Sequence, residues 1–143
     1  MNAEILKPVA VLILWTLVML VWMMIARAPA MKKVGIDIRK VVGGRPNALD
    51  GVVDEKAQWP AHNYIHLLEQ PTLFYAVTLL IAVSGNGDGY TACVAWAYTA
   101  LRIVHSIWQA TINRVIIRFY LFALSTLALL ALAVKAVLIV FAL

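Results

Sequence analysis

The sequence predicts an all-α integral membrane protein in which four transmembrane helices form a bundle. The chain of 143 residues is 64% apolar and only 13% charged, whereas a soluble domain of this size would expose far more charge. The apolar residues are grouped in long runs, and about 20 apolar residues in a helix cross roughly 30 Å of hydrocarbon. The length fits one membrane domain, residues 1–143.

The long apolar runs define four spans. Pro8 lies near the start of the first span, where a missing N–H is harmless. The segment SGNGDG after the second span is typical of a tight turn. Lys135 alone interrupts the apolar run of the fourth span. The predicted spans are about 5–26, 64–83, 90–109 and 114–143.

The positions of lysine and arginine predict the topology. The turn at 84–89 has no basic residue, whereas the segment 27–60 contains Arg27, Lys32, Lys33, Arg39, Lys40, Arg45 and Lys56. With four spans, this segment and the basic connection around Arg114 lie on one side, which the positive-inside rule makes cytoplasmic. Residues 27–63 are then a cytoplasmic loop, and both termini are non-cytoplasmic. The net charge of +5 therefore reflects membrane topology, and no nucleic-acid partner is expected.

Polar side chains form a stripe on each of two predicted helices, near the cytoplasmic face. In the third span, Arg102, His105 and Gln109 are three and four residues apart and share one face. In the second helix, one side of the first two turns carries four polar residues, Asn63, His66, Glu69 and Gln70. Polar groups in membrane helices usually face the bundle interior or a water-filled cavity. Because residues 102–119 contain three arginines and no carboxylate, the stripes indicate a site for an anion.

Each part of this pattern also has a structural interpretation. Arg114 and Arg118 could be arginines that extend to the headgroups from a helix end. Glu69 could pair with Arg102 as a bridge between helices. The charge run 32–40 could be a solvated face or could lie along anionic headgroups.

Two further features favour structural roles. His62 and His66 are one helical turn apart, but no carboxylate or cysteine has the spacing to complete a metal site, and no metal is expected. The tryptophans are interpreted as interfacial anchors rather than a ligand cage. They are Trp15, Trp22, Trp59, Trp96 and Trp108.

The polar stripes resemble those of the MAPEG family, the membrane-associated proteins of eicosanoid and glutathione metabolism. Arg102-x-x-His105 followed by Arg118 resembles the R-x-x-H/Y pattern and the later catalytic arginine of that family. The segment HLLEQPTLF (66–74) resembles the family's N-x-x-E-N-x-P-L-F, with His66 in place of asparagine. The resemblance covers essentially the whole chain and is to a bacterial-type member, which implies a bacterial inner membrane.

The resemblance implies a homotrimer that binds glutathione between subunits, near the cytoplasmic face. The implied activity is that of a membrane-bound glutathione-dependent transferase or peroxidase acting on lipophilic electrophiles. Arg118 would be the catalytic residue that stabilises the thiolate, and Glu69 would receive the amino group of glutathione. The other residues expected to bind glutathione are Arg27, Asn63, His66, Gln70, Arg102, His105, Gln109 and Arg114. The alternative function is a non-catalytic scaffold or a lipid-binding accessory subunit with the same fold.

Overall fold

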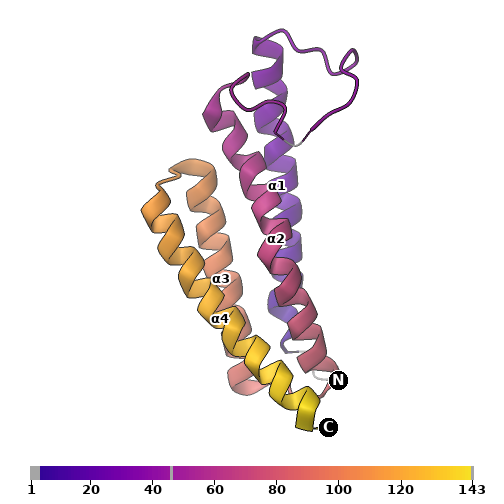
Figure 1. The fold of residues 1–143 in the computed structure, drawn as a ribbon, viewed down its shortest axis with the longest axis vertical. Helices are drawn as coiled ribbons and strands as arrows, with labels where there is room; N and C mark the ends of the chain where they lie inside the picture. Colours follow the sequence, from indigo (N-terminus) through magenta and orange to yellow (C-terminus); the bar gives the residue numbers. More distant parts are fainter. Residues whose placement is uncertain (1–3, 46, 143) are drawn as a thin grey trace.

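Two helical hairpins make up the structure, a computed structural model that describes residues 4–45 and 47–142 (Figure 1). The helices are α1 (Leu6–Lys33), α2 (Glu55–Val83), α3 (Gly89–Thr111) and α4 (Val115–Ala142). α1 packs along α2, and α3 packs along α4. The hairpins join through contacts of α3 with α1 and α2, and of α2 with α4. The predicted all-α four-helix bundle is thus confirmed.

Three of the four helices in the described part of the chain, α1, α2 and α4, are long and apolar enough to cross a membrane. α3 is less apolar because it buries a row of polar side chains inside the bundle. These are Thr91, Thr99, Arg102, His105, Ser106 and Gln109. Its opposite face is apolar, with Val104 and Ile107 exposed on it. α3 therefore hides its polar groups inside the bundle, where hydrocarbon cannot reach them.

The first two helices extend well beyond the predicted spans. α1 continues past Ala26 to Lys33, and α2 begins at Glu55, ahead of the predicted start at 64. The connection outside the helices is therefore residues 34–54 rather than 27–63. The predicted spans count only residues that fit in hydrocarbon, whereas a helix continues into the headgroup layer and water. Pro29 and Pro60 lie inside these extensions, so neither proline ends its helix.

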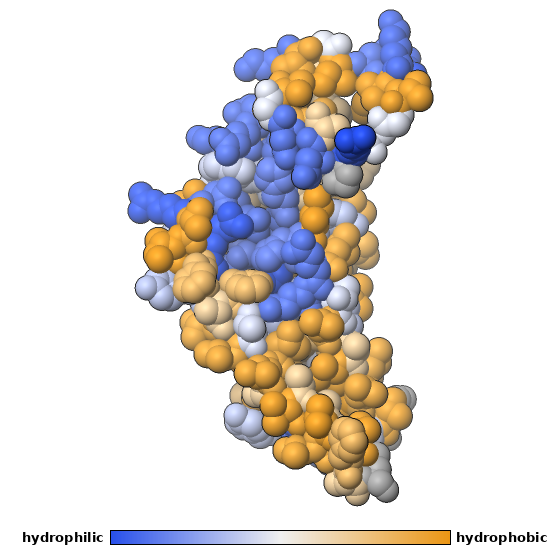
Figure 2. Space-filling view, viewed as in Figure 1, coloured by the Kyte–Doolittle hydropathy of each residue, from blue (hydrophilic) through white to orange (hydrophobic). Residues whose placement is uncertain are grey.

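The two ends of the bundle differ in polarity. The α1–α2 connection and the α3–α4 turn lie at one end, and the start of α1 and the end of α4 lie at the other (Figure 1). Figure 2 shows hydrophilic residues over the first end and hydrophobic residues over the second; we call these the polar end and the apolar end. At the apolar end, the N–H of Ile5 donates to the carbonyl of Gly87 at 3.0 Å. Gly87 belongs to the predicted SGNGDG turn, which the structure confirms as the α2–α3 connection.

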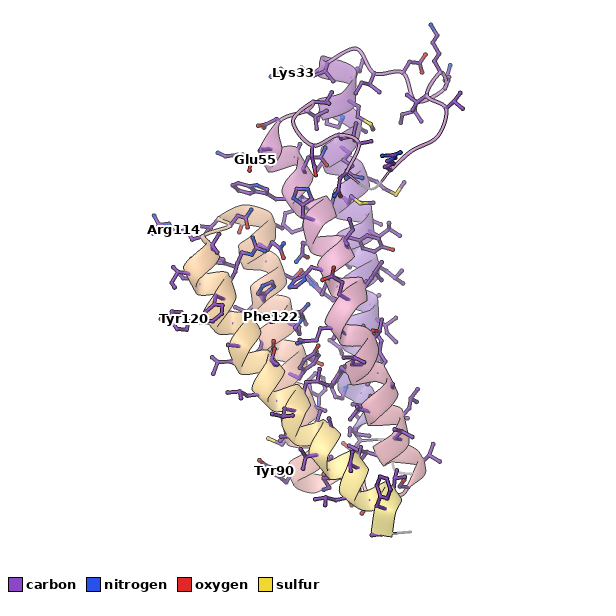
Figure 3. All side chains as sticks on the ribbon, viewed as in Figure 1. Lys33, Glu55, Tyr90, Arg114, Tyr120 and Phe122 are labelled. Carbon is purple, nitrogen blue, oxygen red and sulfur yellow. The ribbon has the colours of Figure 1, made fainter. Side chains whose placement is uncertain are left out.

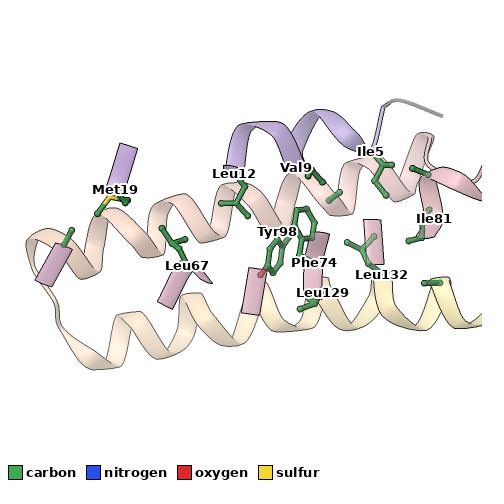
Figure 4. Close-up of a cluster of buried hydrophobic side chains, with 14 residues drawn as sticks. Ile5, Val9, Leu12, Met19, Leu67, Phe74, Ile81, Tyr98, Leu129 and Leu132 are labelled. Carbon is green, nitrogen blue, oxygen red and sulfur yellow. The ribbon is translucent and has the colours of Figure 1, made fainter. Parts of the chain in front are cut away.

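A cluster of buried apolar side chains holds the hairpins together (Figure 4). At its centre the rings of Phe74 and Tyr98 stack with their centroids 4.3 Å apart. Small residues on three helices, Ala82, Ala95 and Ala136, are also buried in the cluster, and such residues let membrane helices approach closely. Lys135, the interruption in the fourth span, donates to the hydroxyl of Thr91 on α3.

Toward the polar end, a chain of buried hydrogen bonds replaces the apolar contacts. The indole N–H of Trp15 donates to Ser106 Oγ at 2.9 Å, so Trp15 lies between helices instead of serving as an interfacial anchor. The hydroxyl of Ser106 donates to Asn63 Oδ1, and Asn63 Nδ2 donates to Gln109 Oε1 at 3.0 Å. Asn63 is fully buried and thereby links α2 to α3 through both atoms of its amide.

Replacing Asn63 with alanine is expected to lower the melting temperature of the detergent-solubilised protein. The change removes the acceptor of the Ser106 hydroxyl proton and the donor to the Gln109 amide oxygen, and an unsatisfied buried group costs about 1–3 kcal/mol. Asn86→Ala is the matched control because the Asn86 side chain is exposed and donates to Ser84 O within the α2–α3 turn. Equal melting temperatures for both variants would contradict a structural role of the Asn63 links.

Candidate functional site

One cavity near the polar end gathers several of the predicted site residues. It has a volume of about 220 Å³ and lies between α2, α3 and α4. Its walls are His66 from α2, His105 from α3 and, from one face of α4, Val115, Arg118, Phe119 and Phe122. Phe122 lies between α4 and α2 (Figure 3), with its ring centroid 5.6 Å from that of His66.

Arg102 is fully buried behind this cavity. Its Nη2 donates to the backbone carbonyl of His66 at 3.1 Å, and its guanidinium carbon lies 5.9 Å from the ring centroid of Phe122, a cation–π distance. Nε and Nη1 have no hydrogen-bond partner among the described residues. A buried cation with unpaired donors is strongly unfavourable, which makes these nitrogens candidate donors to an anionic ligand.

Glu69 does not form an ion pair with Arg102, which corrects one structural interpretation of the sequence. The Glu69 carboxylate lies 2.9 Å from His66 Nδ1, and its side chain is 63% exposed on the outside of α2. Arg102 bonds to the backbone of His66 and not to the Glu69 carboxylate. Among the described residues, Arg102 therefore has a backbone carbonyl rather than a carboxylate as its hydrogen-bond partner.

His105 contributes a third nitrogen without a partner. The side chain is 1% exposed, and its Nδ1 makes no hydrogen bond within residues 4–45 and 47–142. Its ring centroid lies 5.1 Å from that of His66. An imidazole nitrogen can donate or accept, so His105 can complete the hydrogen bonding of a ligand that approaches Arg102.

Arg118 is held at the cavity by the turn that precedes α4. Asn113 has a φ of 58°, in the left-handed region that asparagine tolerates and that ends many helices. From this position Asn113 Oδ1 accepts a hydrogen bond from Arg118 Nη1 at 2.7 Å. Arg118 Nε is buried and has no partner in the described chain. Asn113 thus fixes one side of the guanidinium while another nitrogen stays free.

Three other predicted site residues link the helices. Asn63 and Gln109 form the buried amide pair described above. Gln70 donates to Thr126 Oγ1 on α4 at 2.9 Å and accepts from the hydroxyl of Tyr98 on α3 at 3.3 Å. These contacts fix the distance between the hairpins next to the cavity. In the single chain these three residues therefore support the cavity walls and do not line them.

The two remaining predicted residues lie outside the cavity. Arg27 Nε donates to Gln58 Oε1 at 2.9 Å, between α1 and α2. Gln58 lines a second cavity, of about 330 Å³, together with Asp50 and His62, whose side chains lie 3.0 Å apart. Arg114 is exposed at the α3–α4 turn, and Figure 3 shows it at the outer edge of the bundle. Neither arginine approaches the first cavity within one chain.

Several wall residues carry no sequence signal for a site. Val115, Phe119 and Phe122 read as ordinary residues of an apolar helix, because α4 is apolar almost all round. Asn113 does carry one, since asparagine at a helix end favours a left-handed turn. The hydrogen bond from Arg118 to Asn113, five residues earlier, could not be predicted from their spacing, because it depends on the conformation of the turn.

The arrangement is suited to binding an anion at the edge of an apolar surface. Two guanidinium groups and an imidazole offer unpaired nitrogens, and the Glu69 carboxylate, which contacts His66, is 63% exposed. Arginine donors fork onto carboxylates and similar anions. Val115 and Phe119 are largely exposed, so the cavity opens on the lipid-facing side of α4.

Comparison with known proteins identifies the family of the chain. The family model of the MAPEG family matches residues 5–138. Neither a curated protein nor a solved structure matches the chain. The family match covers nearly all of the chain, including every helix that carries the polar stripes and the cavity. The chain therefore belongs to the MAPEG family of membrane proteins.

Proposed function

We propose that this protein is a glutathione-dependent transferase or peroxidase that acts on lipophilic electrophiles in a bacterial inner membrane. The observation that supports the proposal is the set of four unpaired nitrogens, on Arg102, His105 and Arg118, around the α2–α3–α4 cavity. Family membership gives the proposal its chemistry, because the family is associated with glutathione.

The donor set fits a thiol-containing anion. Glutathione has two carboxylates and a thiol that reacts as thiolate, and all three groups are favoured by unpaired guanidinium donors. A cavity of about 220 Å³ suits the reacting end of the tripeptide, and the remainder would lie outward along α2. Glu69 is exposed there and would accept the ammonium group. Arg27 and Arg114 would meet the ligand only from a neighbouring copy or after a change of side-chain rotamer.

Each residue would have a distinct role. Arg102, fixed by the His66 carbonyl, would position the bound anion. Arg118, fixed by Asn113, would present Nε to the sulfur and favour its thiolate form, which is the nucleophile. Phe119 and Phe122 would provide the apolar contact surface for the electrophile. Because Phe119 is exposed toward lipid, the electrophile would enter from the bilayer.

The exposed carboxylate of Glu69 supports assembly into a homotrimer. Glu69 lies within α2, which is a membrane-spanning candidate, and its side chain is 63% exposed in the single chain. An acidic side chain that faces hydrocarbon is costly, roughly 3 kcal/mol at a helix centre. A neighbouring copy that covers this face of α2 would remove the cost and complete the glutathione site.

The proposed topology places both basic connections in the cytoplasm and both termini outside, as the positive-inside rule predicts.

Reduced glutathione is expected to raise the melting temperature of the detergent-solubilised protein. A ligand at a hundredfold excess over its Kd stabilises the folded state by about 2.7 kcal/mol. Arg102→Gln should abolish the shift because the anion loses its buried donor. Glutathione disulfide serves as a control for non-specific salt effects. No shift for the wild-type protein at millimolar glutathione would favour the alternative function, a non-catalytic scaffold or lipid-binding subunit.

Arg118→Leu is expected to leave glutathione binding nearly unchanged but to reduce the thiolate absorbance of the bound ligand near neutral pH. Without the guanidinium, the thiol loses its proton only at higher pH, so the pH dependence of turnover should move upward. Arg114→Leu is the matched control, because Arg114 is exposed in the turn just before α4, four residues ahead of Arg118. If Arg114→Leu lowers the thiolate signal and Arg118→Leu does not, the catalytic assignment passes to Arg114.

Mass measurement in mild detergent is expected to give three protomers. Glu69→Leu should still span the membrane but should bind glutathione more weakly, because the carboxylate for the ammonium group is lost. Leu68→Ala, at the adjacent exposed position, controls for changes in packing alone. A monomer with undiminished glutathione affinity would contradict a site completed by a neighbouring copy.

A further inference from the structure

The connection between α1 and α2, together with the end of α1, forms a surface that the proposed glutathione site does not use. We propose that this connection, residues 34–54, binds anionic phospholipid and holds the polar end of the bundle against the membrane surface. Two features of the segment carry the proposal: an apolar cavity and a surrounding excess of basic side chains.

The cavity lies within the connection itself. Its volume is about 370 Å³, and its lining includes Met31, Ile36, Ile38, Val41, Leu49 and Arg45. Arg45 is the single charged residue of the lining. The cavity thus combines an aliphatic floor with one cation, which matches the chemistry of an acyl-chain segment next to a phosphate.

Apolar side chains also extend outward from the same segment. Val42 is 96% exposed, and Val34, Ile38 and Val41 are exposed as well. Figure 2 shows hydrophobic patches among the hydrophilic residues at this end of the molecule. Exposed apolar area costs roughly 25 cal/mol per Å² in water, and a group of such residues beside charges is typical of a binding surface. Inserted among headgroups, these side chains would leave water.

The charges around the cavity favour an anionic partner. Residues 32–54 contain five basic side chains and three acidic ones, Asp37, Asp50 and Asp54. Asp50 already lies 3.0 Å from the imidazole of His62 on α2. Asp37 Oδ1 already accepts a hydrogen bond from the backbone N–H of Arg39 at 3.0 Å. The basic residues are Lys32, Lys33, Arg39, Lys40 and Arg45. A second copy of the chain would bring the same positive charge and is disfavoured, and a nucleic acid would leave the aliphatic side chains in water.

The position of the connection brings it within reach of headgroups. α1 extends seven residues past the predicted span end at Ala26, to Lys33, which is about 10 Å of helix. This distance is similar to the Debye length of about 8 Å at physiological salt. Figure 1 shows the connection leaving the top of α1 and turning back down beside it. Basic residues at this height are attracted by anionic lipids.

The proposal can be tested with a fluorescent reporter at Val42. Val42→Cys in a Cys93→Ala background would be labelled with a polarity-sensitive dye, and the full-length protein placed in phosphatidylcholine nanodiscs with or without phosphatidylglycerol. We expect phosphatidylglycerol to shift the emission to shorter wavelength and bromine-labelled acyl chains to quench it. Neutralising Arg39, Lys40 and Arg45 to glutamine should reverse the shift, with each change lowering the docked-to-undocked ratio roughly fivefold.

Two controls make the result decisive. A reporter at Asn86, in the exposed turn at the apolar end, should not respond to phosphatidylglycerol. Lys7→Gln, an exposed cation at that same end, should not alter the Val42 response. Equal emission in both lipids would overturn anionic selectivity. If the emission in detergent shifts with protein concentration, a second copy of the chain covers the surface. If free octanoate in detergent produces the full emission shift, the surface binds a soluble amphiphile. Either result overturns the proposal.

Discussion

The buried guanidinium of Arg102 is the constraint on which the polar half of the bundle depends. It is fully enclosed, yet within residues 4–45 and 47–142 its one hydrogen-bond acceptor is the His66 carbonyl, which bonds to Nη2. Burying a charge in this way is tolerated only where polar groups or a ligand surround it. The polar stripe of α3 must therefore face inward, and α2 must present its own polar stripe at the same level. The exposed apolar faces then contact lipid.

The bundle separates two tasks along its length. At the apolar end, stacked aromatic rings and small residues bring the two hairpins into close contact. Toward the polar end, hydrogen bonds from Asn63, Gln70 and Trp15 hold the helices while leaving space between α2 and α4. Such bonds are directional and fix side chains at defined distances, whereas apolar packing closes gaps. The cavity exists because the helices are joined by polar links at this level and by packing below it.

Much of this organisation follows from residue spacing. The three- and four-residue intervals between Arg102, His105 and Gln109 place these side chains on one face, and all three are buried. The SGNGDG segment predicted the α2–α3 turn. The end of α1 and the start of α2 could not be predicted from the sequence, because helical residues that extend beyond the hydrocarbon have the composition of a loop. Whether Glu69 would pair with Arg102 also could not be read from the sequence, since the pairing depends on side-chain directions across two helices.

The sequence by itself determined the membrane environment, the four helices, their order and the level at which the polar stripes meet, because hydropathy and helical periodicity are local properties. Only the tertiary structure decided which polar groups remain without partners. Arg118 becomes a wall of the cavity because Asn113 adopts a left-handed conformation and accepts its hydrogen bond, whereas Arg114, four residues earlier, points outward. Both arginines look alike in sequence, and the direction of the chain through one turn separates them.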